Sequence, residues 1–283
     1  MVATFHPTTL AEALKIRACH VAIPCAGGTD LLVKYRRGAG ALPAFTGPVV
    51  LLDRCEELRG ISAREDLLHI GALTTLADLA ASDLVHSSLR EAALQMGGPA
   101  LRTIATIGGN VCNASPAGDT LPFLYAFDAQ VRLVAAESER EVPLEQFIVG
   151  PGKTTLRPDE ILSAILIPTW SPTESSWRKV GTRRANALTK VSVAAFVERK
   201  GSRVLRARIA VGAVGPTVIR LRDVEQLLED VSAKDVERIA QSAHEAALQG
   251  VHPIDDQRSS ADYRRTVAAN LVLAFVQKVL RDF

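Results

Sequence analysis

Two glycine pairs are the features of this sequence best suited to binding a ligand. The first lies in Ala26-Gly27-Gly28-Thr29-Asp30-Leu31 and the second in Thr106-Ile107-Gly108-Gly109-Asn110. Glycine accepts positive φ and has no side chain to hold a ligand away, and successive N–H groups in such turns attract anions. Because these residue types also form ordinary turns, each stretch alone could be a simple loop.

The first glycine pair is expected between a strand and a short helix. The apolar run 21–25, which ends at Cys25, precedes it, and the apolar run 31–35 follows it. This order directs amide N–H groups and the positive end of a helix dipole at one point, which suits a diphosphate. The stretch lacks the third glycine of the Rossmann pattern and the Gly-Lys-Ser/Thr of a P-loop, so neither is expected.

Short polar side chains follow the second glycine pair closely, namely Asn110, Asn113, Ser115 and Asp119. We predict a binding loop over residues 106–119. Asp119 stands just before an expected helix over 121–127, where it could cap that helix or accept hydroxyl hydrogen bonds from a ligand.

The two glycine stretches, Asp119 and a later basic segment together resemble the FAD-binding medium subunits of the molybdenum-containing hydroxylases, the xanthine dehydrogenase and carbon monoxide dehydrogenase family. The basic segment contains Lys179, Arg183-Arg184 and Lys190, and the resemblance covers the whole chain. It implies an α+β fold, with a two-subdomain FAD-binding domain of the vanillyl-alcohol-oxidase-like (PCMH) type. A smaller α+β C-terminal domain with an antiparallel sheet and helices would follow.

The resemblance also implies how FAD is held. Residues that match Met96 and Leu162 touch the flavin in the family, and the match of Asp119 contacts the ribityl or ribose region. Lys179 would lie near the pyrimidine edge, where a fixed positive charge stabilises negative charge on the reduced ring. Met96 and Leu162 could otherwise be core residues, and Lys179 could belong to a solvated basic face.

The expected cofactor-binding residues are Cys25, Ala26, Gly27, Gly28, Thr29, Asp30, Leu31, Met96, Thr106, Ile107, Gly108, Gly109, Asn110, Ser115, Asp119, Leu162 and Lys179. Arg183, Arg184 and Lys190 are expected to be scaffold or interface residues. No catalytic residue is expected, because the sequence offers no Ser-His-Asp grouping and no supported pair of carboxylates.

The implied function is electron transfer within a molybdenum hydroxylase complex. FAD would pass electrons from the 2Fe-2S clusters of a small partner subunit to NAD, quinone, oxygen or another acceptor. A large partner subunit with a molybdenum cofactor would hydroxylate the substrate, in a dimer of heterotrimers. Two alternatives remain open: a stand-alone FAD-dependent oxidase or reductase of the same fold family, and a non-enzymatic scaffold or nucleotide-binding module whose glycine turns hold another phosphate.

Net charge, cysteine spacing and the length of apolar runs exclude several other kinds of protein. The 283 residues carry a net charge of only +2, and the four cysteines, Cys19, Cys25, Cys55 and Cys112, form no Cys-x-x-Cys pair. Neither a metal site nor an iron-sulfur cluster is therefore expected here, and neither is a nucleic-acid partner. The sequence shows no signal peptide and no apolar run near the ~20 residues of a membrane span, so a cytoplasmic protein is expected.

The polar stretch 171–176 predicts the main boundary, between an FAD-binding domain over 1–172 and a C-terminal domain over 173–283. The first domain would divide into subdomains of roughly 1–56 and 57–172. Hydrophobic periodicity predicts further elements: a strand-helix-strand start over 21–53, a helix over 87–96, strands over 128–135, 140–144 and 160–168, a hairpin of 191–199 with 204–214, and helices over 221–229, 233–249 and 262–280.

Overall fold

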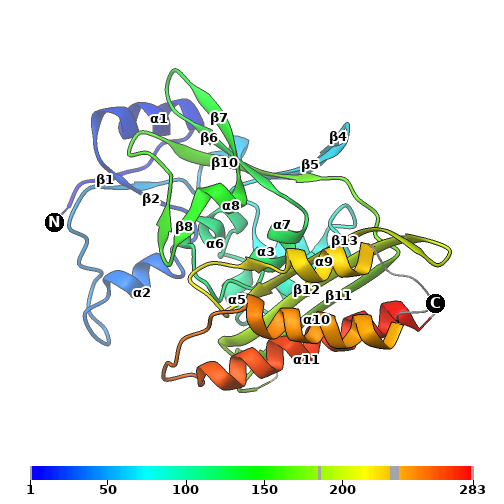
Figure 1. Cartoon of the computed structure of the whole chain (residues 1–283). Helices are drawn as coiled ribbons and strands as arrows, with labels where there is room; N and C mark the ends of the chain where they lie inside the picture. Colours follow the sequence, from blue (N-terminus) through cyan, green and yellow to red (C-terminus); the bar gives the residue numbers. More distant parts are fainter. Residues whose placement is uncertain (1, 184–185, 230–235, 282–283) are drawn as a thin grey trace.

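The computed structural model describes residues 2–183, 186–229 and 236–281. Three sheet-based parts follow one another along the chain, with the N-terminal parts above the C-terminal sheet and its helices in Figure 1. Arg184 and residues 233–235, on which predictions were made, lie outside the described residues.

The N-terminal part is a small parallel sheet in the order β1-β3-β2. Thr9 accepts a hydrogen bond from the N–H of Glu12 and so caps α1, while Ala13, Leu14 and Val50 bury their side chains in a common core. The elements of this part are β1 (Thr4–Phe5), α1 (Leu10–Cys19), β2 (Ile23–Cys25), α2 (Leu31–Tyr35) and β3 (Val49–Leu51). The strand-helix-strand start expected over 21–53 is confirmed by β2, α2 and β3.

The second part is an antiparallel sheet in the order β4-β5-β10-β6-β7, covered by helices. Its strands are β4 (Ile61–Arg64), β5 (Leu67–Gly71), β6 (Gln130–Val134), β7 (Glu139–Pro143) and β10 (Ile161–Pro168), with a small β8–β9 ladder (Ile148–Gly150, Lys153–Thr154). Its helices are η1 (Glu56–Leu58), α3 (Leu76–Ala81), α4 (Ser87–Leu94), α5 (Pro99–Arg102), α6 (Ile107–Asn113), α7 (Leu121–Ala126) and α8 (Leu144–Phe147).

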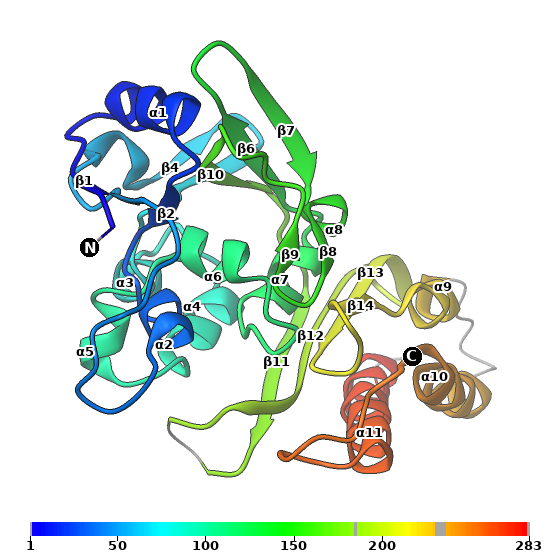
Figure 2. The same ribbon diagram turned by 90° about the vertical axis from the view of Figure 1, so that its left-hand side faces the viewer.

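In its described residues, the C-terminal part is a four-stranded antiparallel sheet backed by three helices, as Figure 2 shows edge-on. Its strands are β11 (Glu174–Gly181), β12 (Thr189–Lys200), β13 (Arg203–Gly212) and β14 (Ile219–Arg220), and its helices are α9 (Arg222–Glu229), α10 (Val236–Gly250) and α11 (Ala261–Leu280). The expected α+β class and the antiparallel C-terminal sheet are confirmed.

Strand β12 contributes to two separate cores. Ala194 and Phe196 belong to the core of the second part, whereas Val193, Ala195 and Val197 belong to the core under α9–α11. Because side chains alternate across a strand, one β-strand can close both cores at once.

Two local predictions were wrong. Residues 107–113 form helix α6 rather than a loop, and no strand was predicted over residues 174–181, where β11 lies. Glycine disfavours helix in isolation, but here Thr106 caps the helix and its first turn is packed against Ala72.

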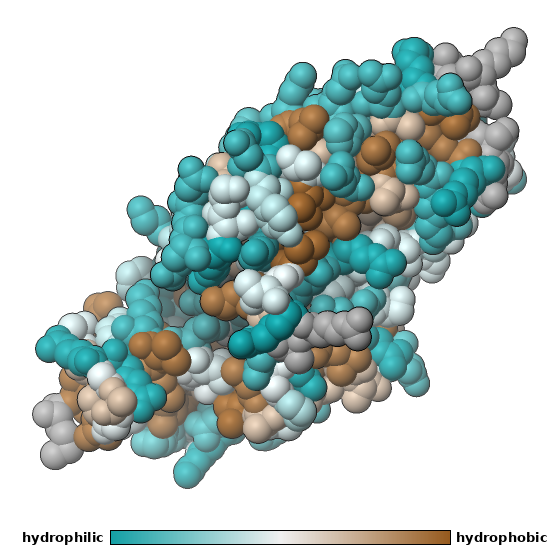
Figure 3. Space-filling view, turned by 90° about the horizontal axis from the view of Figure 1, so that it is seen from below, coloured by the Kyte–Doolittle hydropathy of each residue, from teal (hydrophilic) through white to brown (hydrophobic). Residues whose placement is uncertain are grey.

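No helix within the described ranges is long and apolar enough to cross a membrane. Figure 3, which looks onto α10 and α11 from below, shows apolar residues in short groups among polar ones.

Candidate functional site

All three parts of the chain line one cavity of about 580 Å³. The corner between β2 and α2 forms one wall of the cavity, and α6 with the segment after it forms a second. The end of β11 and the start of β12 form the third wall. The size of the cavity falls within the range of ~300–1,000 Å³ that is usual for small-molecule sites.

The corner at Gly27 and Gly28 has unused backbone donors. Within the described structure, the N–H groups of Gly27, Gly28, Thr29 and Asp30 donate to no protein acceptor. Gly28 has φ +70°, and a Cβ on Gly27 would lie 1.9 Å from the carbonyl oxygen of Ile104. The first position therefore needs glycine for close packing and the second for its backbone conformation, and together they present N–H groups to the cavity.

The second glycine pair differs, because its N–H groups are already used. Gly108 donates to the carbonyl of Ala72 at 2.9 Å, and Gly109 donates to the side chain of Thr106 at 3.1 Å. A Cβ on Gly108 would lie 2.7 Å from Ala72. The prediction that both glycine pairs offer free amides is thus wrong for this pair, which instead lets α6 pack closely and brings Gly109 and Asn110 to the cavity.

A buried ion pair closes the C-terminal wall. Lys179 Nζ lies 2.6 Å from Asp119 Oδ2 and donates to the carbonyl of Gln95 at 3.1 Å, and both charged side chains are 7% exposed. The hydroxyl of Thr189 donates to the other oxygen of Asp119. Burial raises the pKa of Asp119, while the ammonium of Lys179 acts in the opposite direction.

This pairing changes the expected roles of both residues. Asp119 does not cap α7, whose N-cap is Thr120, but holds Lys179 in place. Each carboxylate oxygen of Asp119 can still accept a further hydrogen bond, and Lys179 has three N–H donors, of which two are used. Both residues can therefore contact a ligand without breaking the pair.

The structure brings most of the predicted cofactor-binding residues to this cavity. Its lining includes Ala26, Gly27, Gly28, Thr29, Asp30, Leu31, Met96, Thr106, Gly109, Asn110, Ser115, Asp119 and Lys179. Cys25, Ile107, Gly108 and Leu162 are outside that lining, and Leu162 lies 5% exposed on β10, opposite Leu133, in the core.

Sequence reasoning missed Thr189 and Arg258, which also line the cavity. Thr189 begins β12 and bonds Asp119 from a position 70 residues away, so no local pattern could reveal it. Arg258 lies in the loop between α10 and α11, and a lone arginine in a loop carries no signal of its own.

The free amides at Gly27 and Gly28 and the ion-paired Lys179 line one cavity, and together they fit an anionic, dinucleotide-like cofactor. Residues 1–170 match the family model described as "FAD binding domain in molybdopterin dehydrogenase", and residues 176–279 match the one described as "CO dehydrogenase flavoprotein C-terminal domain". The chain belongs to this family, the FAD-binding subunits of molybdenum-dependent dehydrogenases, and FAD is its cofactor.

Individual relatives agree with this assignment. The chain is 31% identical to the putative xanthine dehydrogenase FAD-binding subunit of Escherichia coli over 99% of this chain and 95% of the relative. It is 31% identical to the carbon monoxide dehydrogenase medium chain of Hydrogenophaga pseudoflava, over 87% of this chain and 85% of that one. A solved carbon monoxide dehydrogenase structure from H. pseudoflava superposes with a TM-score of 0.88 at 27% identity and covers 97% and 96% of the two chains.

Proposed function

We propose that this chain is the electron-transfer subunit of a molybdenum hydroxylase complex. Bound in the cavity, FAD would accept electrons from the 2Fe-2S clusters of a small partner subunit and release them to NAD, quinone, oxygen or another acceptor. The observation that carries this proposal is the convergence of the free amides at Gly27–Asp30, Asp119 and Lys179 on one cavity in a chain of this family.

Each wall of the cavity has a separate role in this proposal. The N–H groups of Gly27, Gly28, Thr29 and Asp30 would bind the diphosphate, because they have no other acceptor. Asn110 and Asp119 would contact hydroxyl groups of the ligand, and Lys179 would face the redox ring with its remaining donor. The other predicted cofactor contacts stay predictions, including Leu162 through its backbone.

The assembly and its location extend the same proposal. We propose a small 2Fe-2S subunit and a large molybdenum-cofactor subunit as partners, in a dimer of heterotrimers in the cytoplasm. Relatives named as a medium chain and as a subunit of a dehydrogenase complex support the multi-subunit form. We also propose that the chain divides into an FAD-binding domain over 1–172, with subdomains near 1–56 and 57–172, and a second domain over 173–283.

The test is to purify the chain with its genetic neighbours and to follow its flavin. The assembled complex is expected to contain one FAD for each copy of this chain. Its flavin absorbance should bleach when a substrate of the molybdenum subunit is added. In a preparation that lacks the iron-sulfur subunit, the same substrate should leave the flavin oxidised. A flavin that bleaches without any partner would support a stand-alone oxidase or reductase instead, and release of a nucleotide other than FAD would contradict both.

A further inference from the structure

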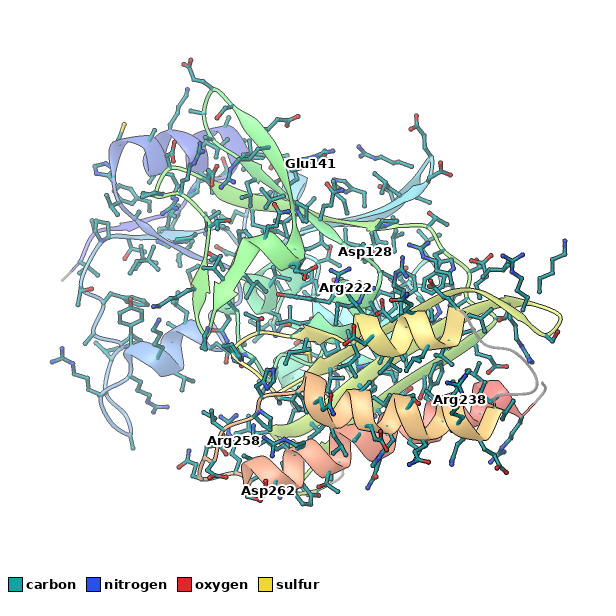
Figure 4. All side chains as sticks on the ribbon, in the orientation of Figure 1. Asp128, Glu141, Arg222, Arg238, Arg258 and Asp262 are labelled. Atoms are coloured by element: carbon teal, nitrogen blue, oxygen red, sulfur yellow. The ribbon has the colours of Figure 1, made fainter. Side chains whose placement is uncertain are left out.

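Arg258 carries a positive charge at the cavity, and no described residue pairs with it. It is the only arginine among the described lining residues, it is exposed, and its guanidinium has no hydrogen-bond or ion-pair partner within that part of the chain. Figure 4 shows it on the loop that joins α10 to α11, on the same side of the molecule as α2.

The other charges that line the cavity offset one another. Lys179 is paired with Asp119 at 2.6 Å. Asp30 and Lys34 have opposite signs and lie one helical turn apart, where the N–H of Lys34 donates to the carbonyl of Asp30 at 2.9 Å. Arg258 therefore accounts for the net positive charge of the described lining, which favours an anion.

Hydrogen bonds hold the backbone of Arg258, although its side chain has no partner among the described residues. Asp256 Oδ1 accepts hydrogen bonds from the N–H of Arg258 at 2.8 Å and from that of Ser259 at 3.1 Å. The same oxygen lies 2.6 Å from Nη2 of Arg264, which is 5% exposed on α11. The loop therefore has a fixed course, and only the guanidinium of Arg258 must be ordered when it binds a ligand.

The same contacts tie this loop to the cavity wall. Arg264 Nη1 donates to the carbonyl of Ala213 at 3.0 Å, and the N–H of Ala213 donates to the carbonyl of Pro116 at 2.8 Å. Pro116 lies between Ser115 and Ala117, which both line the cavity. The position of Arg258 is thus linked through three residues to the wall formed after α6.

We propose that Arg258 binds a phosphate group of the ligand that enters this cavity. A guanidinium can donate two parallel hydrogen bonds to phosphate oxygens, which an ammonium cannot match. The inference rests on the proposed function, because the phosphate belongs either to the diphosphate of FAD or to a dinucleotide acceptor such as NAD. Both sources have the same chemistry, and the experiment separates them.

The experiment measures two dissociation constants on the complex with its partner subunits. FAD binding to the deflavinated complex is followed by fluorescence quenching, and NADH binding to the FAD-loaded complex is followed by equilibrium dialysis. The variants are Arg258→Gln, which removes the charge, and Arg258→Lys, which keeps the charge without the planar fork. Arg203→Gln is the matched control, because Arg203 is exposed at the start of β13 and is outside the cavity lining.

Loss of a charge-assisted hydrogen bond predicts a dissociation constant about tenfold higher in Arg258→Gln. Arg258→Lys should give a smaller increase, and Arg203→Gln none. An increase for FAD alone assigns the phosphate to FAD, and an increase for NADH alone assigns it to the acceptor. Unchanged constants for both ligands in Arg258→Gln, with wild type binding FAD normally, overturn the role of Arg258 alone. A wild-type complex that binds no FAD overturns the proposed function and this inference together.

Discussion

At the scale of single residues, the glycines of the two pairs perform different tasks. Gly27 and Gly108 are required by neighbouring backbone, since a Cβ would lie 1.9 Å from Ile104 in the first case and 2.7 Å from Ala72 in the second. Gly28 is required by its φ of +70°. Only the first pair leaves its N–H groups free for a ligand. The residue types alone could not reveal this difference, because it depends on what lies against each pair.

Gly27→Ala is expected to weaken FAD binding at least tenfold and to lower the melting temperature. The added Cβ would force the corner between β2 and α2 away from Ile104 and Ala105, and thereby move the free N–H groups. Fluorescence titration with FAD and a thermal melt measure the two effects. Gly38→Ala is the control, because a Cβ there meets nothing within 4 Å; equal effects of the two substitutions would contradict the argument.

Asp119→Asn is expected to destabilise the protein by about 3–5 kcal/mol, because it leaves the ammonium of Lys179 buried without its counter-charge. Urea unfolding of the FAD-free protein measures this. Asp83→Asn removes an ion pair with Arg90 in which the Asp83 side chain is 95% exposed, so it should cost less than about 1 kcal/mol. If both variants lost the same stability, Asp119 would have no special role in holding Lys179.

At the scale of elements, the sequence predicted well the helices with one buried face and the strands rich in buried apolar residues. Helices α4, α9 and α11, strands β6, β7 and β10, and the hairpin of β12 with β13 lie within a few residues of the expected ranges. Strand β11 was missed because Glu174, Ser175 and Ser176 look like a linker in sequence, yet they pair with β12. That strand carries Lys179. The family resemblance therefore pointed to this residue, whereas the hydrophobic pattern did not predict the strand on which it lies.

The site could be predicted where its residues are adjacent in sequence and not where distant segments meet. The corner at Gly27 and Gly28 and the polar segment after α6 were found because each is a continuous pattern. The pairing of Asp119 with Lys179 and Thr189 joins residues 60 and 70 positions apart. Such contacts follow from sheet register and packing, which a single sequence does not state.

Helix α4 supplies a prediction about pH. His86 accepts a hydrogen bond from the N–H of Ser88 at 3.1 Å and lies against the rings of Phe123 and Phe196, and this burial lowers its pKa below 6.5. A lowered folded-state pKa contributes stability above about pH 6.5, which is lost as the pH falls through the folded value. The free energy of unfolding should therefore decrease between about pH 7 and pH 5.

His86→Asn keeps a side chain that can cap α4 but does not titrate. It should make the pH dependence of the unfolding free energy shallower, whatever its effect at neutral pH. His252→Asn changes an exposed histidine and should leave the slope as in wild type. An unchanged slope in His86→Asn would show that the acid sensitivity arises elsewhere.

At the scale of the whole molecule, a buried arginine joins the last sheet to the second part of the chain. The side chain of Arg220 on β14 is 3% exposed, and its Nη1 lies 2.8 Å from Asp128 Oδ1 and 2.8 Å from the carbonyl of Tyr125. Its Nε lies 2.8 Å from Glu225 on α9. Figure 4 shows Asp128 and Arg222 close to this junction, where α9 approaches the sheet.

Arg220→Met should cost about 3–5 kcal/mol of unfolding free energy, because buried Glu225 would lose its 2.8 Å ion pair and keep, among the described residues, only the one with Arg208 at 4.0 Å. Chemical denaturation measures the loss, and a second transition would show that the two parts unfold separately. Arg222→Met breaks an ion pair with Glu145 across the same junction, but those side chains are 61% and 55% exposed. That control should cost less than about 1 kcal/mol, and an equal loss in both variants would mean that burial of Arg220 is irrelevant.

The double role of β12 sets where this protein tolerates changes in length. Phe196 faces one core and Val197 the other, and β11 pairs with β12 so that Lys179 lies opposite Ser192 and Gly181 opposite Thr189. Deleting one residue within either strand would exchange the side chains of both faces and carry Lys179 away from Asp119. Insertions between Gly181 and Thr189 would leave that register intact. Changes in length at this edge of the cavity are therefore compatible with the same strand pairing, provided that β11 and β12 keep their residue count.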